Sequence, residues 1–220
     1  VGNAEVALIT GSNTTANHPV AATFMKQAAR EGKTKIIVVE PRRIDMADHA
    51  EMFLQIRSGT DVAFYNAVMH VLIEEDLVDH EFIRTRTRDF ADLKVLVDKY
   101  DPEMASEICG VPADDIRRAA RLLGEAKTAM VFWGMGISQS VHGTDNARCL
   151  IALMMMTGNV MVDRRYLERT ANVVLDADTD RVALERWAQA AQSTGVPTLV
   201  QVNHPGRQCN VFVSRSPVAP

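Results

Sequence analysis

Apolar residues in the first part of the chain fall into short strand-like runs separated by a helical pattern. The run Glu5–Thr10 is rich in β-branched residues and ends at a Gly-Ser-Asn turn, which predicts a strand. Asn17 is a candidate N-cap, and Pro19 suits the first turn of a helix. Apolar positions then recur at helical spacing, at Val20, Phe24 and Ala28. The next run, Lys35–Pro41, has no polar alternation and predicts a strand buried on both faces, so the three elements form a parallel βαβ unit.

The same alternation of elements continues along the chain. A helix is expected from Gly59 to about Asp76, followed by a polar helical region from His80 to Tyr100. The segment Gly110–Ile116 begins another helix, with proline and acidic residues in its first turn. Ala129–Trp133 has the character of a buried strand, and Asp145 begins a further helix. Strands and helices in this order predict a doubly wound α/β domain with a mainly parallel sheet.

Composition narrows the class of protein without identifying it. The hydrophobic share is 47%, the charged share is 24% and the formal net charge is −4, which argues against a nucleic-acid-binding protein. No signal-peptide pattern is visible at the start, and no apolar run approaches the ~20 residues that span a membrane. The absence of an initial methionine suggests a fragment.

The cysteines support neither a disulfide framework nor a metal site. They number 3, they lie far apart at Cys109, Cys149 and Cys209, and they include no C-x-x-C pair. This usage favours a reducing, cytoplasmic location. The apolar run Cys149–Met156 has the length of a buried core helix.

Three of the predicted strands end in residues that suit a nucleotide-like ligand, and ligands of open α/β sheets bind at the carboxyl ends of the strands. Gly11–Asn13 offers close backbone approach and amide donors near a helix start. After the second strand, the Glu40 carboxylate can accept from ribose hydroxyls or a purine edge, and Arg42 and Arg43 can clamp phosphate. Gly134–Gln139 adds two glycines and an amide side chain after the third strand.

Ordinary structure explains each of these features equally well when it is taken alone. The Gly-Ser-Asn sequence is often only a turn, and paired arginines after a strand are usually solvated. Gly134 and Gly136 can simply end a strand, and no G-x-G-x-x-G pattern marks a dinucleotide fold. The chemistry by itself therefore leaves a ligand site and a set of plain turns as open alternatives.

The order of the sequence blocks gives a more specific indication. Over residues 1–160 the chain resembles the molybdopterin domain of formate dehydrogenase alpha subunits. The blocks that carry this resemblance are Gly11–Thr15 with His18 and Pro19, Pro41–Arg43, Arg57–Ala63, Trp133–Ile137 with Gln139, His142–Asn146 and Thr157–Asn159.

The resemblance implies that these loops hold bis-molybdopterin guanine dinucleotide. It assigns Ser12 and Asn13, with Gly11, to phosphate or pterin contacts. Glu40 and Arg42, with Arg43, are expected at the guanosine end, and Gly59 and Asp61 are expected to close over it. Gly134, Gly136 and Gln139 are expected to approach a pterin. Glu40 replaces an aspartate that is common in the family and keeps the carboxylate.

Other parts of the family's pattern are absent from this sequence. The molybdenum ligand, a cysteine or selenocysteine followed by histidine, has no counterpart, because neither Cys109 nor Cys149 has that context. The amino-terminal iron–sulfur motif and the carboxy-terminal domain are absent too. His142 lies in a cofactor-facing loop, but a lone loop histidine is more often structural or solvated. We therefore assign no catalytic residue and no metal ligand, and expect a fragment that depends on other domains or subunits of its parent enzyme.

The last part of the chain resembles a different family. The segments Gly158–Glu168 and Gln201–Gln208 are similar to the early part of the barrel in Old Yellow Enzyme, a flavin-dependent ene-reductase family. This implies a domain over residues 1–157 and an incomplete βα piece of a TIM barrel over residues 158–220. It also assigns Gln201 to the pyrimidine edge of FMN, although an ordinary buried polar residue is the alternative.

Three functions remain open from the sequence. The first is a molybdopterin-binding fragment that supports two-electron oxidation of formate or a similar small substrate. The second is an inactive chimera of the two families, joined within Thr157–Val160. The third is an FMN-dependent ene-reductase fragment.

Overall fold

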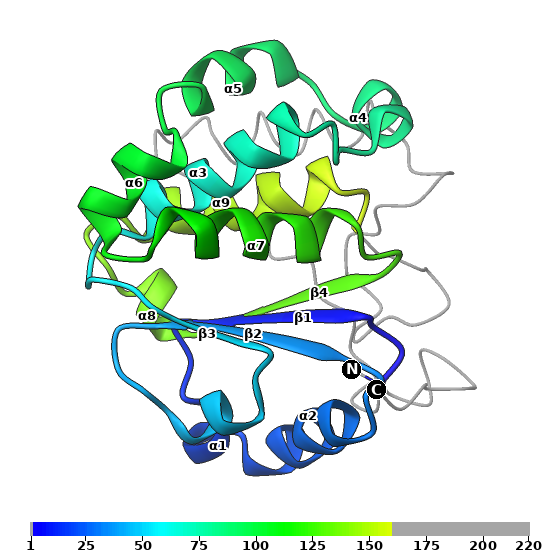
Figure 1. Cartoon of the computed structure of the whole chain (residues 1–220), viewed down its shortest axis with the longest axis vertical. Coiled ribbons are helices and arrows are strands. Elements are labelled where there is room, and N and C mark those ends of the chain that lie inside the picture. The colour runs from blue at the N-terminus through cyan, green and yellow to red at the C-terminus, as the bar shows by residue number, and fades with distance from the viewer. Residues whose placement is uncertain (1, 160–220) are drawn as a thin grey trace, which may run out of the picture. The chain divides into compact units, whose positions relative to one another are not determined.

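A computed structural model describes residues 2–159, which fall within one compact unit of the chain, Val1–Asn159. The unit is built on a four-stranded sheet in the order β3-β2-β1-β4, and every neighbouring pair of strands is parallel (Figure 1). The strands are β1 (Val6–Thr10), β2 (Lys35–Glu40), β3 (Met52–Gln55) and β4 (Ala129–Trp133). Because all four run in the same direction, their carboxyl ends lie along one edge of the sheet.

The first strand in the sequence is central in the sheet. It pairs with β2 from Val6 opposite Lys35 to Thr10 opposite Val39. On its other side it pairs with β4, which places Thr10 opposite Trp133. All five residues of β1 are buried, as its continuous apolar sequence predicts.

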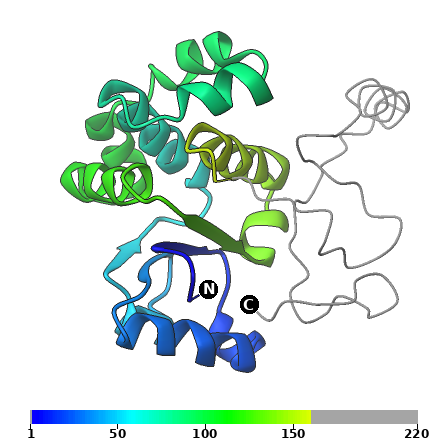
Figure 2. The same ribbon diagram turned by 90° about the vertical axis from the view of Figure 1, so that its right-hand side faces the viewer.

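Helices cover both faces of the sheet. One face carries a layer that includes α3 and α7, and the other carries α1, α2 and a 3₁₀ helix (Figures 1 and 2). The bounds on the first face are α3 (Asp61–Glu74), α4 (His80–Arg86), α5 (Phe90–Val97), α6 (Pro102–Cys109), α7 (Ala113–Gly124) and α9 (Gly143–Met156). The bounds on the second face are α1 (Thr14–Asn17), α2 (Pro19–Arg30) and η1 (Asp45–His49), and the short α8 (Met135–Ser138) follows β4.

The core is divided by the sheet into two parts. In β1, Val6 and Leu8 pack into the larger cluster beneath α3, whereas Ala7 and Ile9 pack into the smaller cluster beneath α2. This division follows from the alternation of side chains along a strand. Helix α3 is the most enclosed helix of the larger cluster, with a continuous buried run from Ala63 to Met69.

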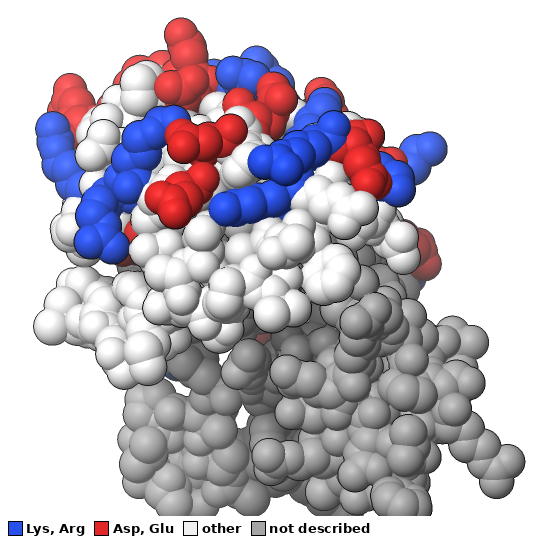
Figure 3. All heavy atoms as spheres, turned by 90° about the horizontal axis from the view of Figure 1, so that it is seen from below, with Lys and Arg blue, Asp and Glu red and all other residues white. Residues whose placement is uncertain are grey.

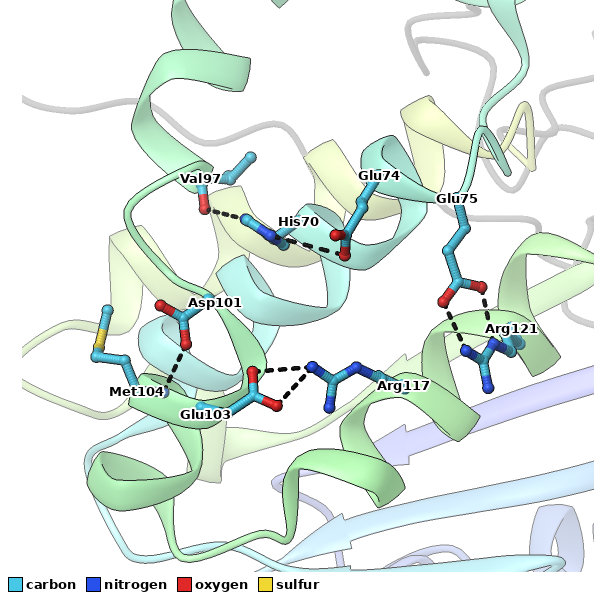
Figure 4. A network of polar contacts seen from close by, with 9 residues as sticks. All are labelled: His70, Glu74, Glu75, Val97, Asp101, Glu103, Met104, Arg117 and Arg121. Carbon is cyan, nitrogen blue, oxygen red and sulfur yellow. Dashed lines mark hydrogen bonds and ion pairs between the residues drawn. The ribbon is translucent and has the colours of Figure 1, made fainter.

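Ion pairs join the helices on the outer side of the larger cluster (Figure 4). Arg121 of α7 contacts both carboxylate oxygens of Glu75, at 2.7 Å each. Arg117 of α7 contacts both oxygens of Glu103 in α6, at 2.6 and 2.8 Å. These pairs connect the end of α3 with α6 and α7 across the protein surface.

The predicted α/β fold is confirmed for the described residues, with helices on both faces of a parallel sheet. The predicted helices after Gly59 and Gly110 and the strand Ala129–Trp133 are present. The polar region from His80 to Tyr100 contains α4 and α5. The last helix begins at Gly143, slightly before the predicted Asp145. The barrel piece predicted for residues 158–220 lies almost wholly outside the described residues.

Two details of the first helical region were predicted wrongly. Asn17 is the last residue of α1 and not an N-cap, because the Gly-Ser-Asn turn already begins a helix at Thr14. The buried stripe of α2 consists of Ala22, Met25 and Ala28. Val20 is 72% exposed, so its apolar character marked a helix but not the side that faces the core.

The prediction missed β3 altogether. Its sequence, Met-Phe-Leu-Gln, is a short edge strand inside a stretch that has no clear periodicity. It is specified by parallel pairing with β2, from Ile37 opposite Met52 to Glu40 opposite Gln55.

Within the described part of the chain, every helix is too short or too polar to cross a membrane.

Candidate functional site

Two loops meet at the carboxyl edge of the sheet between the parallel strands β1 and β4, where the strand order reverses, because β2 and β3 lie on one side of β1 and β4 lies on the other. The loop after β1 begins at Gly11 and the loop after β4 begins at Gly134. The Gly136 amide donates to the Gly11 carbonyl at 3.0 Å, and the Gly134 amide donates to the Thr10 carbonyl at 3.2 Å. In open α/β sheets such a switch point is where ligands bind.

The glycines in these loops are required by the contact between the loops. A Cβ on Gly134 would lie 2.6 Å from the Gly11 carbonyl oxygen, and one on Gly136 would lie 2.7 Å from the Gly11 Cα. Gly11 has φ +56°, and its own Cβ would lie 2.6 Å from the Ile137 amide nitrogen. Backbone therefore packs directly on backbone, so the two loops form one shared platform.

The Glu40 carboxylate connects the end of β2 with the loop after β1. One of its oxygens accepts a hydrogen bond from the backbone amide of Ser12. Glu40 is only 9% exposed, and burial raises the pKa of its carboxyl group. The Ser12 amide and Arg42 act in the opposite direction, whereas the nearby Asp61 adds to the increase.

A second carboxylate and a buried phenol lie next to Glu40. Asp61 is the first residue of α3, and burial raises the pKa of its side chain. Tyr65, one turn further along the helix, is fully buried and donates from its hydroxyl to the Thr10 hydroxyl oxygen at 2.6 Å. Burial raises the Tyr65 pKa well above its usual value, so the phenol stays neutral and serves as a donor.

The polar groups continue into the core beneath these residues. Asn66 is 2% exposed, and its side-chain oxygen accepts from the Cys149 thiol at 3.6 Å. Burial raises the pKa of Cys149 to about 12, so the residue is an uncharged thiol at neutral pH. Tyr65, Asn66 and Cys149 were not among the predicted site residues, and Cys149 was expected only as part of a buried core helix. A polar side chain within an otherwise apolar stretch is a signal that could have identified Asn66.

The two arginines after β2 have different surroundings. The Arg43 guanidinium contacts Asp48 at 2.7 Å and lies over the Phe53 ring, 5.3 Å from its centroid. Arg42 forms no salt bridge with any residue in the part that the structure describes, and it lies close enough to affect Glu40 electrostatically. Arg42 is therefore the cation of the pair that can reach a phosphate without giving up another partner.

A hollow of about 520 Å³ adjoins these residues. Arg57 on its wall donates to the carbonyl oxygens of Glu107 and Ile108 and so closes the end of α6. Gln55 donates to the Pro41 carbonyl at 3.0 Å. The lining residues are Pro41, Gln55, Ile56, Arg57, Ser58 and Gly110. Pro41, Arg57 and Ser58 lie in the sequence blocks that carry the family resemblance, whereas Gln55 and Ile56 were missed because β3 was not predicted.

The structure brings six of the twelve predicted site residues together at the strand ends. Gly59 has φ +80° and forms the turn before α3 with open space around it. Gln139 is exposed at the end of α8, and His142 is exposed at the start of α9. Gln201 lies outside the described residues. The residues that meet directly at the strand ends are Gly11, Ser12, Glu40, Asp61, Gly134 and Gly136.

These groups suit an uncharged or anionic organic ligand better than a metal ion. Among residues 2–159, no cluster of three or more His, Cys, Asp or Glu side chains could hold a metal. Helix α1, which follows the loop after β1, instead contains a buried hydroxyl, Thr15 Oγ1, that has no partner within the described region. Arg42 and this hydroxyl are donors that match phosphate and pterin oxygens, so the residues present fit a phosphate-bearing pterin cofactor.

The described residues on the side of the sheet that α1 and α2 cover carry charges of both signs (Figure 3). Figure 3, seen from the side of α1 and α2, shows positive and negative side chains interspersed, next to a band without charged residues. The sequence from Val6 to Met25 has no Lys, Arg, Asp or Glu, which accounts for such a band. A phosphate backbone would need a positive surface of one sign, and this face does not provide one.

Comparison with known proteins identifies related chains. Residues 1–205 match the family described as Molybdopterin oxidoreductase. The match extends over most of the stretch for which the sequence suggested a flavin-enzyme resemblance, and that resemblance has no support from these comparisons.

Several relatives carry a similar segment. The chain is 44% identical over 157 residues to the F420-dependent formate dehydrogenase subunit alpha of Methanocaldococcus jannaschii, covering 71% of this chain and 23% of that protein. It is 39% identical over 160 residues to formate dehydrogenase H of Escherichia coli, covering 73% and 22%. The solved structure of acetylene hydratase from Pelobacter acetylenicus matches with a TM-score of 0.67 and 29% identity, covering 71% and 22%. The chain thus spans less than a quarter of the length of these relatives.

Proposed function

Because this chain belongs to the molybdopterin oxidoreductase family, we propose that residues 1–157 bind the guanine dinucleotide and pterin parts of bis-molybdopterin guanine dinucleotide. The observation that carries the proposal is the convergence of three strand ends on one platform. There the Gly11 and Gly136 backbones are hydrogen-bonded to each other, and Glu40 is hydrogen-bonded to Ser12. A nucleotide with its phosphates bridges such a platform more readily than a small substrate does.

Each strand end has its own part in this proposal. Ser12 and Asn13 face the phosphates or a pterin, because they lie in the loop that leads into α1. Arg42 clamps a phosphate, and Arg43 can do so only after its ion pair with Asp48 opens. Glu40 and Asp61 lie at the guanosine end, next to the hollow that begins at Pro41.

The remaining loops complete the proposed site. Gly59 forms the turn that brings Asp61 over the nucleotide. The loop from Gly134 to Gln139 approaches a pterin with its backbone, because glycines allow close contact. When bound, the cofactor supplies a metal centre for two-electron chemistry. The described residues bind and orient it and contribute no metal ligand.

We infer that the choice of reaction lies outside this segment. Proteins named formate dehydrogenase and acetylene hydratase contain similar segments, although their names describe different reactions. Oxidation of formate, dependence on other domains or subunits, and a cytoplasmic location are therefore proposals for the parent enzyme. The Old Yellow Enzyme-like piece, an FMN site at Gln201 and a chimeric origin also remain predictions.

The full chain should be produced in a host that makes the cofactor, and its pterin content should be measured after oxidation to a fluorescent product. We expect stoichiometric pterin in the wild type, loss of most of it in Arg42→Ala, and retention in the matched control Arg43→Ala. Folding of each variant should be checked by circular dichroism. A folded wild-type protein without pterin would contradict the proposal, and equal loss in both arginine variants would contradict the assigned role of Arg42.

A further inference from the structure

Glu40 is placed to act on the loop after β1. It is the last residue of β2, and its backbone position is fixed by pairing with Gln55 of β3. One of its carboxylate oxygens accepts from the Ser12 amide, which belongs to the loop after the neighbouring strand. The side chain therefore links two strand ends within the protein, before any ligand is present.

Both backbone polar groups of Ser12, its amide and its carbonyl, form hydrogen bonds within the protein. Glu40 holds the amide, while the Ser12 carbonyl accepts from the Thr14 amide at 2.9 Å and from the Thr14 hydroxyl at 3.4 Å. The preceding residue, Gly11, is held by Gly136. The backbone of the loop is thus held by hydrogen bonds with Glu40, Thr14 and Gly136. Glu40 provides the only charged group among these contacts.

We propose that Glu40 is a positioning residue, which orients the Gly11–Asn13 loop toward the cofactor through the Ser12 amide and does not need its charge to contact the nucleotide. This inference rests on the proposed function, because it states how one residue of that site works. One carboxylate oxygen is engaged by the Ser12 amide, whereas the other is the oxygen that a ribose hydroxyl would have to use. The length of the side chain matters as well, since aspartate would withdraw the carboxylate by about 1.5 Å.

The electrostatic surroundings agree with a role that depends on accepting a hydrogen bond. Asp61, Arg42 and Tyr65 are the titratable groups that face Glu40 from the neighbouring elements. Burial and the negative charge of Asp61 raise the pKa of Glu40, so its environment disfavours the ionised form. A neutral acceptor of the same shape should therefore serve equally well at this position.

The test uses the full chain, guanosine diphosphate as the probe, and three substitutions of Glu40. Glu40→Gln keeps an acceptor oxygen at the same distance, so we expect affinity within about twofold of the wild type. Glu40→Asp and Glu40→Ala lose the contact with Ser12, so we expect affinity about tenfold weaker, as for loss of one hydrogen bond. Binding should be measured by calorimetry, and the unfolding midpoint of each variant should be recorded as a check of folding. If Glu40→Gln binds as weakly as Glu40→Ala while Glu40→Asp retains affinity, the charge itself contacts the ligand and the inference is wrong.

A second readout needs no ligand. The Ser12 amide should exchange slowly with solvent in the wild type and in Glu40→Gln, and rapidly in Glu40→Ala, as measured by NMR. Its proton shift should follow a titration above pH 4.5 in the wild type and stay constant in Glu40→Gln. If the wild type fails to bind guanosine diphosphate, the proposed nucleotide site is wrong, and this exchange pattern alone decides whether Glu40 holds the loop. Rapid exchange of Ser12 in the wild type would overturn the inference.

Discussion

Carboxylates occur in two contrasting regions of this α/β unit, the outer layer of α3, α6 and α7 and the carboxyl edge of the sheet. In the helical layer, Arg121 lowers the pKa of Glu75 and Arg117 lowers that of Glu103, each through a pair of hydrogen bonds (Figure 4). At the edge, burial raises the pKa values of Glu40 and Asp61, and neither residue has an arginine in direct contact.

The difference separates groups that serve folding from groups that serve a ligand. Paired surface charges are already satisfied by the protein, and each contributes little. Carboxylates of raised pKa at the sheet edge have no cation in direct contact among the described residues, and groups with shifted pKa values concentrate at functional sites. The four predictions below test this contrast, from the largest expected effect to the smallest.

Replacement of Gly11 by alanine should cause the largest loss of stability. Gly32 is a matched control, since it has a similar φ of +68° but has nothing near the position of a Cβ. Gly32→Ala should cost about 1–2 kcal/mol from backbone strain alone. Gly11→Ala should cost roughly 3–5 kcal/mol, because its Cβ also collides with backbone at Ile137. Urea unfolding measures both, and equal losses would show that the two glycine loops do not pack as described.

Removal of the Tyr65 hydroxyl should have the next largest effect. Tyr65→Phe keeps the ring, which packs edge-on against Phe64 at 5.1 Å between centroids, but leaves the Thr10 hydroxyl without its donor. We expect a loss of about 1–2 kcal/mol in the free energy of unfolding. A double-mutant cycle with Thr10→Val measures the coupling energy between the two hydroxyl groups. A coupling energy near zero would show that this buried hydrogen bond stabilises the protein no more than a surface contact does.

The two regions should respond to pH in opposite directions. A carboxyl group whose pKa is raised by folding binds more protons in the folded state, so stability falls as the pH rises above the ordinary values of 4.5 for Glu40 and 3.8 for Asp61. Groups of lowered pKa, such as Glu75, instead lose their stabilising contribution as the pH falls below 4.5. Glu40→Gln should therefore be at least as stable as the wild type at pH 7, with the difference vanishing at lower pH. Chemical unfolding across this range checks the sign, and a lower stability of Glu40→Gln at pH 7 would contradict it.

The smallest effect is expected in the helical layer. Glu75→Gln removes the charge that pairs with Arg121, but both side chains are partly solvated. The shift in unfolding midpoint should be smaller than that of Tyr65→Phe and should shrink further in high salt. A larger shift would mean that the helical layer, like the sheet edge, contains charges that are individually important.

The sequence predicted the interior of the fold better than its margins. The strands Val6–Thr10 and Lys35–Glu40 are apolar over nearly their whole length, so the sequence alone predicts that they are buried. Strand β3 was missed because four residues at an edge depend on pairing with a neighbour. The buried side of α2 was wrong because Val20 and Ala22 are both apolar but lie on different sides of the helix, and only the position of the sheet decides which side is buried.

The candidate site was predictable where it follows directly from the ends of strands. Ser12, Glu40 and Gly134 were identified because parallel strands bring their carboxyl ends together. Their mutual contacts could not be predicted, since the bond from Ser12 to Glu40 depends on side-chain reach between loops. Tyr65 was out of reach for a different reason. An aromatic residue within an apolar stripe looks like any core residue until its hydroxyl is found beside Thr10.

The central place of β1 has a consequence for how the protein is synthesised. Strand β1 ends at Thr10, but its second partner, β4, begins only at Ala129. At ribosomal speeds the delay between the two strands is on the order of ten seconds. During that time β1 can pair with β2, while its other edge presents unpaired amides and carbonyls beside apolar side chains. The nascent chain therefore passes through a stage in which chaperone capture or aggregation competes with the arrival of β4, and the same late strand completes the glycine platform.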